Sequence, residues 1–314
     1  MQPVADAGRT VENWRIVDAL DLAAGSNPGS MTFLQDGSLL MPAGSSAVNV
    51  VDLDAGQAHL VGAMTADGAP LQGYYAPVAV FDDQLLYRYF DAAEMSRLRI
   101  APLDGSGEPT EVEFPQGAAY LSEDGTILSQ DGASGVVVYA VDGSDGFSLH
   151  EFGAEGPAGE LMAVDQLVAH EVPSVTYHLG AVGGSYWFAL VEEQEMYIGA
   201  QDYLGLYRVN LESGQVDQID PGAPLSTRHN LHDLGAMGAA ITGPGELFYV
   251  SPTGEVGPVP SALVEEYPGA DRDLFDSVRA QGDDLLIAGY QMVELYSCDL
   301  DLLRQRIHLR PSLS

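Results

Sequence analysis

The sequence predicts an all-β domain built from one repeated unit of short antiparallel strands. Apolar or alternating runs recur along the chain, and Asp-Gly, Asp-Asp and Pro-Gly pairs of the kind found in hairpin turns separate them. No stretch keeps a sustained helical period; residues 263–275 come nearest, and Pro268 interrupts them. Hydrophobic residues make up 46% of the 314 positions, alongside 36 Gly and 18 Pro, which supports a core with frequent turns and argues against disorder.

Six units are expected in chain order. Their first two strands read 31–44, 78–90, 118–132, 186–202, 239–254 and 277–291. A third strand with an acidic turn follows at 47–56, 96–107, 135–146, 204–214 and 293–302. Short fourth strands then read QAHLVG, PTEVEF, FSLHEF, QVDQID and RQRIHL. The first turns centre on Asp36, Asp82, Asp124, Glu193, Pro244 and Asp283, and most spacings are close to the roughly 40–50 residues of a propeller blade.

This repeat resembles the β-propellers of the broad class that includes YVTN-repeat, TolB-like and gluconolactonase-like proteins. The resemblance covers about residues 12–310 and rests on repeat architecture, without a family signature. It implies one propeller domain over residues 1–314, with four-stranded antiparallel blades around a central channel. Six blades are expected, with seven as the alternative, and the six lie at about 30–64, 74–114, 118–153, 179–220, 233–260 and 273–310.

Two segments do not fit the repeat directly. The long step from Asp124 to Glu193 leaves residues 154–178 as an inserted lid or a degraded extra blade. The N-terminal strand, residues 13–22, is expected to pair with a C-terminal strand and close the ring, although the last unit already has four strands of its own.

The charge balance limits the classes of partner. The chain has 46 acidic and 12 basic side chains, all of the latter Arg, and a net charge of −34. Such a surface repels nucleic acid and attracts cationic ligands or a basic protein partner. A GC-rich genome, which would remove Lys and Asn codons together, or a salt-adapted host would also produce this composition.

The sequence also bears on the cellular location of the protein and on its redox chemistry. No apolar run approaches the roughly 18 residues of a membrane-spanning helix, so no membrane span is expected. Residues 1–15 lack the pattern of a signal peptide, but a leader removed from the mature protein is compatible with the sequence. An extracellular or periplasmic, secreted protein is expected, with the cytoplasm of a salt-adapted host as the alternative. The single Cys298 permits no internal disulfide.

Several catalytic motifs are absent from the sequence. It contains no Gly-x-Ser-x-Gly elbow, P-loop, GxGxxG after a strand, CxxC pair or HExxH. Hydrolysis of the α/β-hydrolase kind and nucleotide-dependent chemistry are therefore unsupported. The acidic segments 51–56 and 141–146 lack the full ligand spacing of an EF-hand and are interpreted as turns.

The best candidate site lies where residues before the innermost strands ring one mouth of the channel. The segments His178-Leu-Gly-Ala-Val-Gly and His232-Asp-Leu-Gly-Ala-Met-Gly place a histidine in matching positions of neighbouring units. Two imidazoles with carboxylates can bind a divalent metal ion. The candidate ligands are His178, His232, Asp233, His229, Asp276 and Asn27. The competing interpretation is structural, with each histidine bonding a neighbouring blade.

Further side chains are candidates for catalysis beside His178, His232 and Asp233. His170, in the segment that interrupts the repeat, is a candidate general acid or base on a lid. Tyr75 stands at the channel mouth, and Arg88 is the one cation expected near the channel, where it would bind a substrate carboxylate or neutralise neighbouring acids. The connections between second and third strands, Asp131 among them, are expected to form an acidic rim.

The sequence therefore favours a metal-assisted hydrolase, lactonase or lyase that binds a small-molecule substrate at the channel mouth. Gluconolactonase-like propellers use carboxylate and Asn ligands, and Asn27 and Asp276 occupy comparable places, but the histidines depart from that pattern. Propeller lyases that act on uronic-acid sugars are the closer chemical analogy, by fold class only. The alternative is a non-catalytic propeller that binds a protein partner or a ligand through its acidic face.

Overall fold

The structure is a computed structural model of the chain and consists of strands and their connections. It describes residues 13–17, 32–33, 39–43, 47–52, 57–62, 76–81, 84–90, 96–104, 106–113, 120–121, 125–126, 128–131, 135–143, 146–165, 174–192, 203–220, 230–234, 237–243, 246–251, 253, 255–258, 277–281, 284–289, 292–297 and 303–309. Within these ranges there is no helix of the length and hydropathy that crossing a membrane requires.

The first three sheets are antiparallel and follow the chain from inner to outer strand. The first sheet contains β2 (Thr32–Phe33), β3 (Leu39–Ala43), β4 (Ala47–Asp52) and β5 (Gln57–Gly62). The second contains β6 (Ala76–Phe81), β7 (Gln84–Phe90), β8 (Ser96–Pro102) and β9 (Thr110–Val112). The two-stranded pair β10 (Tyr120–Leu121) and β11 (Gly125–Thr126) precedes the third, which contains β12 (Leu128–Gln130), β13 (Val137–Asp142), β14 (Gly146–Gly153) and β15 (Gly156–Asp165).

The remaining sheets continue the same pattern. The fourth contains β16 (Ser174–Val182), β17 (Ser185–Glu192), β18 (Tyr203–Asn210) and β19 (Val216–Ile219). The fifth contains β20 (Asn230–Asp233), β21 (Ala239–Gly243), β22 (Glu246–Val250) and β23 (Val256–Pro258). The last contains β24 (Ser277–Gln281), β25 (Asp284–Gly289), β26 (Met292–Ser297) and β27 (Leu303–Leu309), with β1 (Asn13–Val17) added outside β27.

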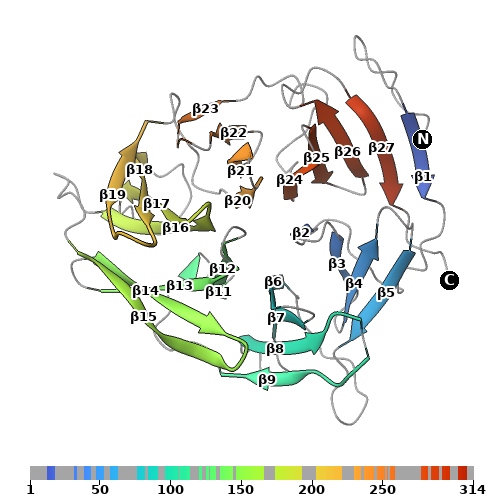
Figure 1. Cartoon of the computed structure of the whole chain (residues 1–314), viewed down its shortest axis with the longest axis horizontal. Coiled ribbons are helices and arrows are strands. Elements are labelled where there is room, and N and C mark those ends of the chain that lie inside the picture. The colour runs from blue at the N-terminus through green and yellow to red at the C-terminus, as the bar shows by residue number, and fades with distance from the viewer. Residues whose placement is uncertain are drawn as a thin grey trace.

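The sheets stand radially in a ring, with the first strand of each sheet nearest the centre (Figure 1). Four-stranded antiparallel sheets in this arrangement form a β-propeller, which confirms the all-β fold class that the repeats predict. The fold places the start of every sheet at the centre, so inner-strand residues are the ones that can converge there.

The hydrophobic core is divided among the spaces between neighbouring sheets. Leu40 and Val50 of the first sheet pack with Leu85 and Tyr87 of the second. Separate clusters join the second sheet to the third, the third to the fourth and the fourth to the fifth. Because strand residues alternate between two faces, each described sheet in the middle of the chain buries both faces against its neighbours.

The structure differs from the expected strand assignment in the third, fourth and fifth sheets. Segment 135–146, expected as a third strand, supplies the second strand β13, and FSLHEF lies in the third strand β14 instead of at the outer edge. Residues 156–165, part of the proposed lid or degraded blade, form the outermost strand β15. The difference arises because β15 continues directly from β14 through a short turn that the apparent repeat did not include.

In the next two sheets the difference is in the opposite direction, because the segment expected to be the innermost strand is the second strand. Residues 186–191, expected to begin the innermost strand, lie in the second strand β17, and the innermost strand is β16. The turn between them is Gly183–Gly184, where both residues have positive φ (59° and 74°), the geometry of a two-residue hairpin. Residues 239–243 are likewise the second strand of the fifth sheet.

The N-terminal strand pairs with the C-terminal strand, as expected from residues 13–22. β1 runs parallel to β27, from Asn13 opposite Gln305 to Val17 opposite Leu309. It is a fifth strand on a sheet that already has four, so it joins the two ends of the chain without completing a blade.

Candidate functional site

His178 lies in the inner strand β16, and its side chain faces the third sheet. Its Nε2 atom is 3.1 Å from Asp142 Oδ1 at the end of β13. The Phe147 ring meets the imidazole edge-on at a centroid distance of 5.0 Å, and the Tyr186 ring lies 5.9 Å away. His178 is only 1% exposed, so its imidazole is part of the packing between two sheets.

Asp142 is the acidic residue among the side chains that surround His178. The Asp142 side chain is 57% exposed, so it connects the buried imidazole to solvent. Burial raises the pKa of the Tyr186 hydroxyl far above its ordinary value, and the nearby Asp142 carboxylate raises that pKa further. Tyr186 therefore remains protonated at physiological pH.

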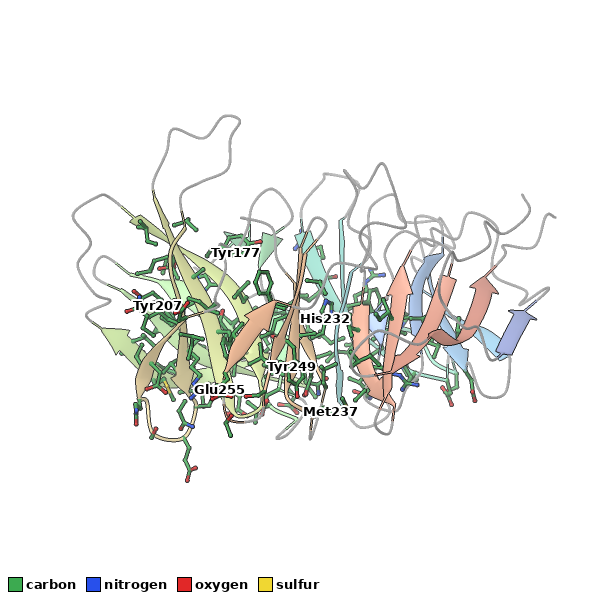
Figure 2. The ribbon with its side chains drawn as sticks, turned by 90° about the horizontal axis from the view of Figure 1, so that it is seen from above. Tyr177, Tyr207, His232, Met237, Tyr249 and Glu255 are labelled. Carbon is green, nitrogen blue, oxygen red and sulfur yellow. The ribbon has the colours of Figure 1, made fainter. Side chains whose placement is uncertain are left out.

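His232 lies in β20, the inner strand of the fifth sheet, near the middle of the molecule in side view (Figure 2). Its Nε2 atom is 2.7 Å from Thr242 Oγ1 on the neighbouring strand β21. Burial lowers the pKa of His232 to about 4, so the ring is neutral at physiological pH.

The two histidines lie in different interfaces. Leu231, next to His232, packs into the cluster between the fourth and fifth sheets, so strand alternation turns His232 to the opposite face, toward the last sheet. His178 instead faces the third sheet. Among the contacts of the described residues, none joins the two imidazoles. Asp233 follows His232 and therefore points to the other face of β20.

The other predicted site residues are not placed in detail. Arg88 lies in β7, opposite Ala76 and Leu98, and only its backbone is described. His170, Tyr75, His229, Asp276 and Asn27 lie outside the described residues. Within the described part of the chain, no group of three or more His, Cys, Asp or Glu side chains is arranged to hold a metal ion.

Ser129, Gln130 and Asp131 form hydrogen bonds from the third sheet to both neighbouring sheets. The sequence does not single out these three residues as a group. The Gln130 side chain accepts from Val80 N (3.0 Å) and donates to Val80 O (2.7 Å) in the second sheet. Ser129 Oγ accepts from Ala181 N (2.8 Å), and Asp131 Oδ1 accepts from Gly184 N (3.0 Å), both in the fourth sheet. Asp131 is fully buried. The expected rim residue is thus a link between sheets.

The sequence contains a signal for this arrangement. The Gly-Gly pair at 183–184 stands between two apolar runs, which is typical of a hairpin turn. Read as a turn, it makes β16 the inner strand and places His178 inside that strand. Gly180 has φ of +121°, and a Cβ atom built there would lie 2.5 Å from Ser129 Oγ. Close approach of β12 and β16 therefore requires glycine at this position.

No protein-family model matches the chain, and no curated protein matches its sequence. The chain is similar in structure to the GH74 xyloglucanase from Xanthomonas campestris, with a TM-score of 0.50 and 12% identity over 94% of this chain and 56% of the xyloglucanase. It is also similar to a protein of unknown function from Bacteroides thetaiotaomicron, with a TM-score of 0.48 and 11% identity over 94% and 74% of the two chains. At these identities the likeness concerns the fold alone. The likeness to the xyloglucanase agrees with a β-propeller fold.

Proposed function

We propose that this protein is a non-catalytic β-propeller that binds a basic protein partner through its acidic surface. The observation that carries the proposal is the charge of the exposed side chains. In the described part of the chain, eleven exposed side chains are carboxylates and one, Arg97, is a guanidinium. The carboxylates are Asp52, Asp104, Glu108, Glu111, Glu113, Asp142, Glu155, Glu160, Glu212, Asp220 and Glu255.

The distribution of these acids favours a macromolecule over a small cation. They lie on several sheets, most of them in or beside outer strands, so the negative potential extends over a wide surface. At one point two sheets meet: a Cβ atom on Gly156 would lie 3.4 Å from Val112 Cγ1 and 3.9 Å from Glu113 Cβ. Glu111, Glu113 and Glu155 therefore form an acidic seam between the second and third sheets. The burial of His178 in an interface also favours binding over catalysis.

The test is a binding titration with a poly-L-arginine peptide, and a poly-L-glutamate peptide of equal length as control. Poly-arginine should bind at low salt, with an affinity that falls steeply as salt rises. Replacing Glu111, Glu113 and Glu155 with Gln should weaken binding several-fold. Replacing Glu212 with Gln, Asp220 with Asn and Glu255 with Gln removes the same charge elsewhere and should weaken it less. Absent binding at low salt, or equal binding of both peptides, would contradict the proposal.

A metal-assisted hydrolase, lactonase or lyase is the second candidate. It is favoured by the position of His232 on an inner strand, where His229 precedes it in the sequence and the start of each sheet faces the centre. These residues would hold the ion, which would polarise a carbonyl or activate water. Elemental analysis of protein purified without chelators tests it. About one equivalent of metal, lost in the His232→Ala variant, would support this function over simple binding.

We also infer a ring of six blades. Support comes from the six sheets of four or more strands in the described residues and from the direct pairing of β1 with β27 at the junction of the chain ends.

A further inference from the structure

Two buried polar atoms in the interface between the third and fourth sheets have no hydrogen-bond partner among the described residues. They are Nδ1 of His178 and the hydroxyl oxygen of Tyr186. His178 is 1% exposed and Tyr186 is fully buried. Buried side-chain polar atoms in folded proteins are nearly always bonded to protein or to ordered water, and one left unbonded destabilises the fold by about 1–3 kcal/mol.

The bond to Asp142 fixes which hydrogen-bonding groups remain. An ionised carboxylate only accepts hydrogen bonds, so His178 Nε2 carries the proton that is shared with Asp142 at 3.1 Å. With that proton on Nε2, the uncharged form of the ring has a lone pair at Nδ1, which needs a donor. The Tyr186 hydroxyl supplies one donor and can also accept.

The His178 and Tyr186 rings lie together beside the Phe147 ring. The Phe147 ring packs edge-on against the imidazole and tilted against the Tyr186 ring, at centroid distances of 5.0 and 6.0 Å. Apart from Tyr207, which carries a hydroxyl, the other members of this cluster are apolar, with Ala181, Phe188 and Leu190 among them. The His178 and Tyr186 rings themselves are 5.9 Å apart between centroids and inclined at 55°.

We propose that His178 Nδ1 and the Tyr186 hydroxyl bind one water-sized hydrogen-bonding molecule, water itself in the resting protein, in the interface between the third and fourth sheets. The guest donates to Nδ1 and accepts from the hydroxyl. It completes a hydrogen-bonded chain that runs from the exposed Asp142 carboxylate through His178 to the buried Tyr186. This site is separate from the acidic surface and does not depend on the proposed function.

The first test is the Tyr186→Phe variant, compared with wild type by thermal and urea unfolding. If the hydroxyl binds a guest, its removal lowers the melting temperature, because the guest and Nδ1 lose a partner. If the hydroxyl is unbonded, its removal relieves a buried unsatisfied group and raises the melting temperature, which would overturn the proposal. Tyr207→Phe removes a hydroxyl from the same hydrophobic cluster and serves as the matched control.

The second test observes the site directly. In protein labelled with 15N-histidine, His178 should show the Nε2-protonated tautomer, with an Nδ1 resonance shifted by an accepted hydrogen bond. That resonance should move toward the unbonded value in Tyr186→Phe and stay in place in Tyr207→Phe. A cross-peak between bound water and the Tyr186 hydroxyl should appear in wild type. A direct bond from the hydroxyl to Nδ1 without water, or an unbonded Nδ1, would overturn the proposal.

Discussion

In the described part of the chain, several single residues join one sheet to the next. His178 bonds Asp142 across the interface of the third and fourth sheets, and Gln130 bonds the backbone of Val80 in the second. The structural interpretation of His178, that it bonds a neighbouring blade, is the one that its contacts support. The Nε2 atom and the buried ring of His178 are both engaged in this interface.

Among the described glycines, Gly180 is the one at which an added Cβ atom would lie nearest to another residue. Gly180→Ala would place a methyl group 2.5 Å from Ser129 Oγ on a backbone with φ of +121°. We expect a loss of about 3 kcal/mol in the free energy of unfolding, from backbone strain and the weakened bond of Ser129 to Ala181. Urea unfolding measures it.

Gly183 provides the control for that substitution. Its φ is also positive (+59°), but a Cβ atom there would meet nothing within 4 Å, so Gly183→Ala should lose only about 1 kcal/mol. Adding Ser129→Ala to Gly180→Ala should recover part of the loss by removing Oγ. Equal losses for the two glycine variants would show that close packing at Gly180 is unimportant.

His232 makes stability depend on pH. Its pKa is lowered from 6.5 to about 4 in the folded protein, so between these values the unfolded chain binds more protons. The free energy of unfolding therefore falls as pH drops from about 6.5 to 4. The whole pKa shift corresponds to a loss of about 3 kcal/mol, and the actual loss is smaller because the ring is only partly shielded from water. His232→Gln should show a correspondingly shallower loss over this range in urea unfolding. Parallel curves for the variant and wild type would contradict this assignment.

At the scale of elements, the N-terminal strand is an addition to a complete sheet. The four strands β24–β27 pair among themselves, and β1 adds one short parallel ladder outside β27. Removing residues 1–17 should therefore leave a folded protein and lower the free energy of unfolding by only about 1–2 kcal/mol.

The comparison for this deletion is truncation after residue 302, which removes β27. That strand pairs with β26 on one side and β1 on the other, so its loss breaks two ladders. We expect a much larger drop in melting temperature than for the N-terminal deletion. If removing residues 1–17 alone prevented folding, β1 would be essential to ring closure, against this expectation.

The strand assignment shows what a repeat in the sequence can determine. In the first, second and last sheets, the predicted first two strands are the inner and second strands, and the predicted turn residues Asp36, Asp82 and Asp283 fall between them in the sequence. In the middle of the chain, adjacent strands such as β13 and β14 or β21 and β22 pair as the sequence predicts, but their positions within the sheet differ by one strand from the prediction. Local turn chemistry defines a hairpin, but it does not say which two of three successive strands begin a sheet.

For the whole molecule, the net charge of −34 dominates the response to solution conditions. Charges of one sign repel more strongly in the compact state than in the expanded unfolded chain, so the melting temperature should rise as KCl is increased from low ionic strength. Calorimetry across a KCl series checks this. A melting temperature that is constant or falls with added salt would show that repulsion does not limit stability.

The sequence by itself determined the all-β class, the four-strand unit, the acidic surface and the pairing of the two chain ends. These follow from patterns that are local or additive: strand alternation, turn residues and summed charge. Only the tertiary structure decided which strand is innermost in the third to fifth sheets, and hence that His178 is buried against Asp142 and Phe147 while His232 faces another interface. A one-residue shift reverses the face that a side chain occupies, and a one-strand shift changes its distance from the centre. Only packing between sheets selects both.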